Sequence, residues 1–364
     1  MTRGQIKRHT RTRKKASKPA KSPFYKRKVF LWPVGIVLGL IIVILLAFRL
    51  SPWPGALVIR WDFDQNGRKV WSALAAHEPK GGVASIVDQQ YRSGDKDAML
   101  DVYFPQSATK SSQKLPLLIW THGGAWLSGD KTNVDPYAKI IASKGYTVIS
   151  LNYSLAPGAI YPTPVHQIND AYAYIQQNAD RFHADTNNIV LAGDSAGSQL
   201  SAQMATIITS PVYASEVNVM PNLKPKQLKG VVLNCGIYMM ERLAYPNPGL
   251  SKLLGWGDDV TVWAYSGTHD FSDPVIREMS PYYHVTKDFP ATYITGGNAD
   301  PLTDTQSKPF AAKLESLGVK VDKLFYDENH TPGLPHEYQF NLNNQDGQHA
   351  LQATLDFMRE YMSD

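Results

Sequence analysis

The sequence predicts an α/β fold in which helices flank a mostly parallel central sheet, with a small cap insertion and one N-terminal transmembrane helix. Three observations lead to this prediction. Short apolar runs alternate with amphipathic helical patterns through most of the chain. Several of these runs are continuously β-branched, which is typical of strands buried on both faces of a parallel sheet. One stretch near the N-terminus has twenty residues without a charge.

The N-terminal segment has the composition of a membrane anchor. Residues 1–28 contain twelve Lys or Arg and no Asp or Glu, and the uncharged run at 29–48 follows directly. Such a run is long enough to cross the hydrocarbon core of a bilayer as one helix. A cleaved signal peptide is the alternative, but the run is longer than usual for one and no small-x-small cleavage site follows it. We therefore expect a basic cytoplasmic arm at 1–28 and an uncleaved anchor at 29–48.

The charge distribution predicts where the rest of the chain lies. The positive-inside rule places the N-terminus in the cytoplasm and residues 50–364 outside it, in a single-pass protein of the cell membrane. Beyond residue 28 the chain has 25 basic and 32 acidic residues, a balance that argues against binding to nucleic acid. The basic arm is expected to contact anionic lipid headgroups.

The single cysteine, Cys235, excludes an internal disulfide, and its apolar neighbours predict a buried thiol.

Eight short apolar runs are the candidate strands, and the first two are close enough to pair as an antiparallel edge. They are residues 83–87, 99–104, 117–120, 146–151, 189–192, 230–233, 291–295 and 321–326. Helices are expected at 170–178, 198–208 and 308–317, with a final helix at about 350–361. Residues 49–80 indicate a linker and lead-in helix, 81–364 the main domain, and 236–288 a cap or pocket insertion above the carboxyl edge of the sheet, where ligands bind.

A serine lies at the predicted junction between a strand and a helix. Residues 193–197 read Gly-Asp-Ser-Ala-Gly, which matches G-x-S-x-G with Ser195 at its centre. A turn this sharp strains the backbone of the serine and needs small residues on both sides, and it raises the hydroxyl out of the sheet. The N–H of Ala196 can then donate to an oxyanion that develops on a carbonyl attacked by the serine.

A second glycine-rich turn follows the strand predicted at 117–120. It reads His122-Gly123-Gly124, and two glycines there let the backbone N–H groups approach a substrate oxygen closely. A turn that merely ends a strand is the alternative. We expect Gly123 and Gly124 to supply oxyanion donors, and His122 to form hydrogen bonds within the turn rather than to act as a base.

A serine nucleophile needs a base and a carboxylate that orients the base. Asp300 follows the strand predicted at 291–295, and Asp304 is its rival from within the next helical segment, so Asp300 is favoured. Two histidines, His330 and His336, follow the last predicted strand, where the base is expected in the chain order Ser, Asp, His. The spacing to the final helix favours His336, and His330 stays as the alternative base.

These motifs resemble the α/β-hydrolase superfamily, and within it the hormone-sensitive-lipase-like carboxylesterases. The resemblance spans about residues 120–340 and rests on four segments in the family's order: HGGAW at 122–126, NYSLAPGAIYPTPVHQINDAYAYI at 152–175, GDSAGSQLSA at 193–202 and ADPLTD at 299–304. It implies an α/β-hydrolase fold, with Ser195 as nucleophile, Asp300 as orienting acid, and Gly123, Gly124 and Ala196 as oxyanion donors.

Two positions depart from the family's pattern. Ala125 stands where many members have a third glycine. The segment that begins at His336 resembles the family's His-Gly-Phe signature, but Glu337 stands in place of its glycine. The insertion at 236–288 lies where relatives vary their pocket, so specificity does not transfer. Its aromatic side chains are candidates to line an acyl or sugar pocket, with core packing as the alternative. They are Tyr238, Trp256, Trp263, Tyr265, Tyr282 and Tyr283.

The expected function is a serine carboxylic-ester hydrolase that cleaves short acyl esters, of small molecules or polysaccharide, outside the cytoplasm. This chemistry needs no metal and no organic cofactor. Two alternatives stay open: an amide-cleaving relative, such as an acyl-peptide or arylformamide hydrolase, and a non-catalytic binding module on the same scaffold.

Overall fold

The computed structural model describes residues 1–2, 28–244 and 252–362. The chain divides into two compact units, Met1–Leu50 and Ser51–Asp364. The first unit contains helix α1 (Lys28–Leu50), in which Trp32–Leu50 is long and apolar enough to cross a membrane. A signal sequence near the N-terminus would have the same length and composition. The basic arm expected at 1–28 lies almost wholly outside the described residues.

The second unit is built on an eight-stranded sheet with the order β1-β2-β4-β3-β5-β6-β7-β8. Its strands are β1 (Val83–Gln90), β2 (Met99–Pro105), β3 (Leu115–Thr121), β4 (Thr147–Leu151), β5 (Ala184–Asp194), β6 (Leu228–Asn234), β7 (Ala291–Gly296) and β8 (Val321–Phe325). Strand β2 pairs antiparallel with both β1 and β4, and the remaining pairs are parallel. The mostly parallel sheet and its antiparallel edge are therefore confirmed.

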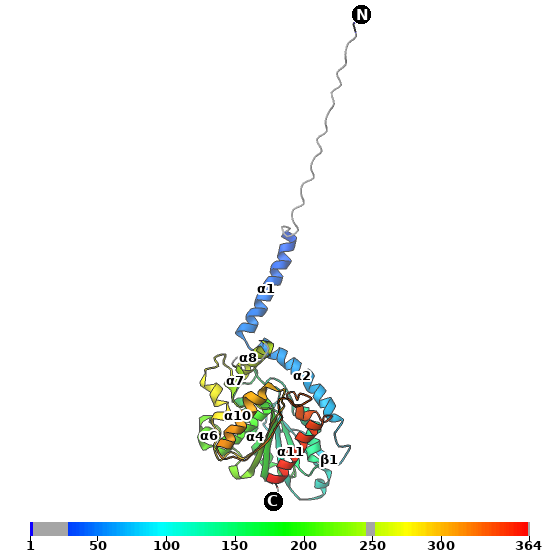
Figure 1. Ribbon diagram of the computed structural model, residues 1–364, viewed down its shortest axis with the longest axis vertical. Helices are drawn as coiled ribbons and strands as arrows, with labels where there is room; N and C mark the ends of the chain where they lie inside the picture. The colour runs from blue at the N-terminus through cyan, green and yellow to red at the C-terminus, as the bar shows by residue number, and fades with distance from the viewer. Residues whose placement is uncertain (3–27, 245–251, 363–364) are drawn as a thin grey trace. The chain divides into compact units, whose positions relative to one another are not determined.

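Helices cover both faces of this sheet, as Figure 1 shows. Alternate residues of the central strand β3 enter different cores: Leu117 and Ile119 belong to one hydrophobic cluster, Leu118 and Trp120 to the other. Helices α4 (Thr163–Gln177) and α5 (Ala196–Thr209) pack into the first cluster, α3 (Asp135–Ala142) and α11 (Gln345–Met362) into the second. Both clusters consist of residues from the second unit alone, so Ser51–Asp364 contains a complete core.

The final helix begins earlier than the sequence predicted. Helix α11 starts at Gln345 rather than near residue 350. The side chain of Asn344 accepts the backbone N–H of Asp346 at 3.0 Å, which is the hydrogen bond of a helix N-cap. The polar start of this helix hid it from a search based on apolar periodicity.

The remaining helices include α6 (Pro211–Glu216), α7 (Met240–Ala244), α8 (Lys252–Ser266), α9 (Pro274–Glu278) and α10 (Lys308–Ser316). Helices α7 to α9 fall within the insertion expected at 236–288, of which residues 245–251 lie outside the described ranges. Tyr238 and Tyr265, two aromatic residues of the insertion, are fully buried in the core.

Helix α2 (Trp53–Ala75) occupies most of the range expected to hold a lead-in helix, and it belongs to the same compact unit as the sheet. Its residue Gly55 lies against Val260 of α8, where an added Cβ would come within 2.9 Å of a methyl carbon. The guanidinium of Arg60 donates to the carbonyls of Leu127 at 2.5 Å and Ala156 at 2.8 Å. Helix α2 is thereby fixed to loops at the carboxyl edge of the sheet.

Candidate active site

The nucleophile candidate Ser195 lies in a strained turn between β5 and α5. Its backbone has φ 50° and ψ −120°, a left-handed region that costs a non-glycine residue free energy. The turn needs both flanking glycines. A Cβ added to Gly193 would lie 2.4 Å from a backbone atom of Gly197, and a Cβ added to Gly197 would lie 2.0 Å from the carbonyl oxygen of Thr121. The G-x-S-x-G pattern therefore forms the strand-to-helix turn that its spacing predicted.

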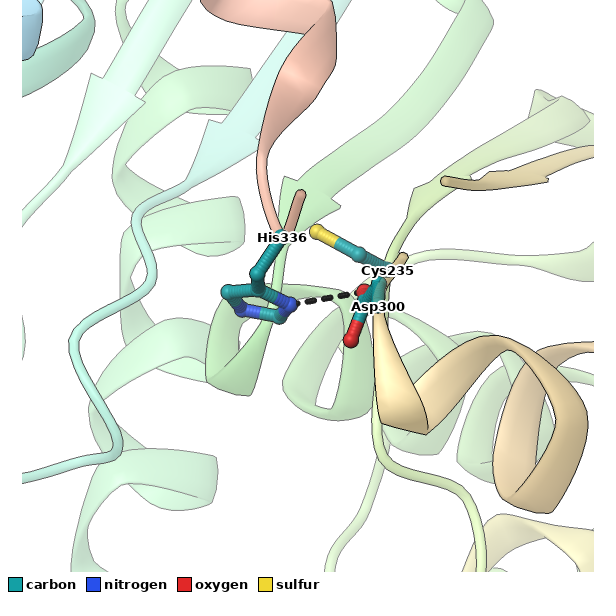
Figure 2. Close-up of side chains that lie close together, drawn as sticks. All are labelled: Cys235, Asp300 and His336. Atoms are coloured by element: carbon teal, nitrogen blue, oxygen red, sulfur yellow. Dashed lines mark hydrogen bonds and ion pairs between the residues drawn. The ribbon is translucent and has the colours of Figure 1, made fainter. Parts of the chain in front are cut away.

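The structure brings Asp300 and His336 together, as Figure 2 shows. Nδ1 of His336 lies 2.8 Å from Oδ2 of Asp300, and Asp300 is buried. The other carboxylate oxygen accepts the backbone N–H of Leu302 at 3.0 Å, which fixes the orientation of the carboxylate. Asp300 follows β7 and His336 follows β8, so adjacent parallel strands deliver both groups to one edge of the sheet.

The two rival residues lie in other environments. Nε2 of His330 lies 3.0 Å from Oδ2 of Asp346, a residue of α11. Asp304 is exposed and pairs with Lys308 at 2.6 Å, one turn further along the chain. Neither lines the cavity that contains Ser195. The geometry thus favours His336 and Asp300 as partners for the serine.

A cavity of about 310 Å³ joins the predicted groups. Ser195, His336, Gly123 and Gly124 all line it, and Asp300 lies behind His336. Helix α2 forms one wall of this cavity with Phe63, Asp64, Asn66, Gly67 and Val70. None of the six aromatic residues proposed from the insertion contributes to the lining, so the wall comes from a segment that the sequence placed in a linker and lead-in helix.

The glycine turn after β3 requires one correction to the predicted oxyanion donors. The N–H of Gly123 donates to Oδ2 of Asp194 at 2.9 Å, so this group holds the turn against the serine turn instead of facing the substrate. Gly124 has φ 104°, and no group in the described ranges accepts its N–H. Ala196 is the first residue of α5, where a backbone N–H has no partner within the helix. Gly124 and Ala196 are therefore the better candidates.

His122 has the structural role expected of it. Its ring is buried, its Nδ1 lies 2.7 Å from the carbonyl oxygen of Gly123, and it stacks on Tyr153 with ring centroids 4.5 Å apart. Burial lowers the pKa of this imidazole below its ordinary value, so the ring is neutral at pH 7. His122 thus shapes the glycine turn from within.

A pair of carboxyl groups lies directly behind the nucleophile, and the sequence did not predict it. Asp194 accepts the indole N–H of Trp120 at 2.7 Å in addition to the N–H of Gly123, and its carboxylate is hydrogen-bonded to Glu337. Burial, followed by the charge of Asp194, raises the pKa of Glu337 to about 7. Because donors already hold both oxygens of Asp194, Glu337 is the member of the pair that takes up the proton as the pH falls through about 7.

Cys235 is a second neighbour that the sequence did not place at the site. It is buried as predicted, but it also follows β6 and lies beside His336 and Asp300, with ligand atoms of the three residues within 4.8 Å of one another (Figure 2). Sulfur, imidazole and carboxylate form a donor set that can bind a transition metal. However, Nδ1 of His336 is already hydrogen-bonded to Asp300, so a metal at that nitrogen would disrupt this pair.

The surroundings of His336 predict its titration. Burial alone would lower the pKa of the imidazole, but Cys235 and Asp300 beside it more than offset this effect, so its pKa lies above 6.5. A general base must be neutral, and a raised pKa keeps the ring protonated to higher pH. We expect kcat/KM of a reaction that depends on His336 as a base to rise with pH. When initial rates are measured between pH 5 and 9, the midpoint of this rise should lie above pH 6.5.

The variant Glu337→Gln tests which groups set that midpoint. An ionised Glu337 stabilises the imidazolium form of His336, whereas glutamine is neutral at every pH and can still donate to Asp194. The substitution should move the midpoint to lower pH by roughly 0.5 to 1 unit. Superimposable profiles for the two proteins would show that Glu337 does not influence the pKa of His336.

Comparisons with known proteins agree with this geometry. Residues 100–314 match the model of the BD-FAE family. The chain is 28% identical over 268 residues to the esterase LipC of Mycobacterium tuberculosis, a match that covers 72% of this chain and 62% of LipC, less than two thirds of its length.

Solved structures show the same fold. Esterase B from Lactobacillus rhamnosis superimposes with a TM-score of 0.72 at 19% identity, covering 86% of this chain and 96% of that one. An esterase from Pyrobaculum calidifontis superimposes with a TM-score of 0.64 at 22% identity, covering 84% and 93%. With more than half of its length matched by the family, the chain belongs to the BD-FAE family and has the α/β-hydrolase fold that its motifs predicted.

Proposed function

We propose that this protein is a serine carboxylic-ester hydrolase that cleaves short acyl esters outside the cytoplasm. One observation carries the proposal: the strained Ser195 and the Asp300-paired His336 line the same cavity. A serine in a strand-to-helix turn, a base oriented by a buried carboxylate and free backbone N–H groups are together the requirements for acyl transfer. The names of LipC, esterase B and the Pyrobaculum protein, all esterases, support the same reaction class.

The proposed mechanism assigns one role to each group. Oγ of Ser195 attacks the ester carbonyl while Nε2 of His336 accepts its proton, and Asp300 stabilises the imidazolium through Nδ1. The N–H groups of Gly124 and Ala196 stabilise the oxyanion of the tetrahedral intermediate. His336 then returns the proton to the leaving alcohol, and water releases the acyl group from Ser195 by the same sequence of steps. No step requires a metal or an organic cofactor.

The dimensions of the cavity support a short acyl group. Its volume of about 310 Å³ lies at the small end of the range for ligand pockets. One of the solved relatives, esterase B, was studied with a phosphonate related to tributyrin, whose acyl chains have four carbons. We infer that acetyl to butyryl esters suit the site, with the alcohol directed toward the α2 wall.

The N-terminal helix supports a location at the membrane. We propose that residues 29–48 form an uncleaved anchor, with the basic arm in the cytoplasm and the catalytic domain on the opposite side. Esters in that location include small molecules from the environment and acylated polysaccharides of the cell envelope.

An ester panel tests the proposed reaction on purified residues 51–364, the unit with a complete core. p-Nitrophenyl acetate and butyrate should be hydrolysed, with kcat/KM at least about tenfold lower for the octanoate, whose four extra methylenes exceed the cavity. The matching p-nitroanilides provide the amide arm. Faster cleavage of the anilides would favour the amidase alternative, and no turnover of either series would favour a binding module.

A further inference from the structure

The first half of α2 presents large apolar side chains to solvent. Trp53, Leu57 and Trp61 are four residues apart, so they lie along one side of the helix, and Val58 widens this surface. Their exposed fractions are 47%, 52%, 65% and 50% for Trp53, Leu57, Trp61 and Val58. We name these four residues the α2 apolar face. Contiguous exposed apolar surface of this kind marks an interaction site.

The α2 apolar face is held rigidly on the catalytic unit. The opposite side of the helix is buried through Ala56 and Ile59, and Gly55 packs on Val260 of α8. Arg60, within the same segment, donates two hydrogen bonds to loops of the catalytic unit. The exposed side chains therefore belong to a helix that is packed on the catalytic unit, not to a flexible linker. A partner that binds the α2 apolar face would consequently also orient the active site.

Chain connectivity identifies the occupant. Only Ser51 and Pro52 separate α2 from the end of α1, and two residues bridge no more than about 10 Å. If α1 spans a membrane, the first turn of α2 must lie near the lipid–water boundary, whatever the arrangement of the two units. Tryptophan is enriched at that boundary because its ring is apolar and its N–H is polar. Two of the four side chains are tryptophan.

We propose that the α2 apolar face docks the catalytic unit on a lipid bilayer, with Trp53, Leu57, Val58 and Trp61 inserted among the headgroups. The proposal rests on the proposed membrane anchor and is independent of ester hydrolysis. Beyond residue 28 the chain is acidic, so the attraction is apolar rather than electrostatic. Docking is expected on zwitterionic lipid and to persist at high salt.

Docking would place the substrate cavity close to the lipid surface. Phe63, Asn66 and Val70, in the second half of the same helix, line the cavity that contains Ser195. At 1.5 Å of rise per residue, the cavity wall begins within about 10 Å of the inserted side chains. Esters at the bilayer surface then reach the nucleophile without crossing bulk water.

Sedimentation with phosphatidylcholine vesicles tests the proposal on residues 51–364, which lack the anchor. The unit should bind the vesicles in 0.1 M and in 0.5 M NaCl, and the double variant Leu57→Gln/Trp61→Gln should bind at least about tenfold more weakly. The matched control is Val212→Gln/Met220→Gln, which removes two other exposed apolar side chains, 80% and 87% exposed, and should bind like wild type. All three proteins should hydrolyse p-nitrophenyl acetate at the same rate.

A labelling experiment tests the same proposal without the double variant, and it therefore still applies if that variant fails to fold. The only native cysteine, Cys235, is buried, so a single Leu57→Cys substitution can be labelled selectively with a polarity-sensitive fluorophore. Its emission should shift to the blue with vesicles, and that of labelled Val212→Cys should not. Three results would overturn the proposal: equal vesicle binding by the Leu57/Trp61 variant and wild type, no binding by either, or no shift at position 57. Unchanged hydrolysis in these experiments would leave the proposed function intact.

Discussion

Replacing Ser195 with alanine is expected to lower kcat/KM for p-nitrophenyl acetate by at least about 10⁴-fold. The hydroxyl is the only group in the proposed mechanism that forms a covalent bond to the substrate, so the remaining site can only bind and polarise the ester. The cavity and its backbone donors stay in place, because alanine removes one oxygen from a turn whose shape is set by Gly193 and Gly197. Steady-state rates with an active-site titration of the wild type measure the effect.

Ser201→Ala is the matched control for this experiment. Ser201 lies within α5, the helix that begins directly after Ser195. It is also buried, and it donates its hydroxyl to the carbonyl of Ala192 at 2.8 Å, outside the cavity lining. Its removal should cost about 1 kcal/mol of unfolding free energy and leave kcat/KM within a few-fold of wild type. Comparable activity in the Ser195 and Ser201 variants would contradict a serine mechanism at residue 195.

His336→Ala should be nearly as damaging, with a loss of about 10⁴-fold or more in kcat/KM. Without the imidazole, the Ser195 hydroxyl has no base, and the carboxylate of Asp300 loses the partner that lies 2.8 Å away. The assay should be run on the alkaline side of the wild-type pH midpoint, where the imidazole is neutral and the difference is greatest.

His330→Ala separates the two histidines of this loop. Its imidazole pairs with Asp346 and lies outside the cavity lining, so we expect near-wild-type kcat/KM. The loss of this partly exposed hydrogen bond to Asp346 should lower the unfolding free energy by about 1 kcal/mol or less. An active His336 variant beside an inactive His330 variant would reverse the assignment.

The elements that depend on local sequence pattern were predicted well. All eight strands overlap the apolar runs from which they were predicted. The prediction was easiest in the centre of the sheet, where both faces are covered and a strand such as β4 is buried at every position. The serine turn was predictable for a similar reason, since its geometry allows only glycine at residues 193 and 197.

The parts of the site that depend on tertiary contacts were not predictable. The sequence assigned the N–H of Gly123 to the substrate, and only the fold shows that the carboxylate of Asp194 accepts it. Glu337 was recognised as a departure from the family's glycine, but its hydrogen bond to Asp194 joins residues far apart in the chain. Cys235 adjoins Asp300 and His336 because the three residues follow the neighbouring strands β6, β7 and β8, a strand order that no local pattern reports.

Helix α2 shows the same limit on a larger scale. Its sequence indicates a helix, but its exposed aromatic residues and central charges gave no reason to expect that it forms a wall of the cavity. The contact depends on Arg60 reaching two backbone carbonyls that lie 67 and 96 residues further along the chain. Hydrogen bonds to backbone carbonyls leave no mark on the identity of the residues that accept them.

The central claim is that Ser195 is the nucleophile activated by His336, and covalent labelling tests it most directly. Residues 51–364 should be treated with a fluorophosphonate, digested and mapped by mass spectrometry while residual esterase activity is followed. We predict one adduct, on Ser195, that forms in step with the loss of activity and at least about 10³-fold more slowly in His336→Ala. An adduct on another residue, or full activity with Ser195 modified, would contradict the account.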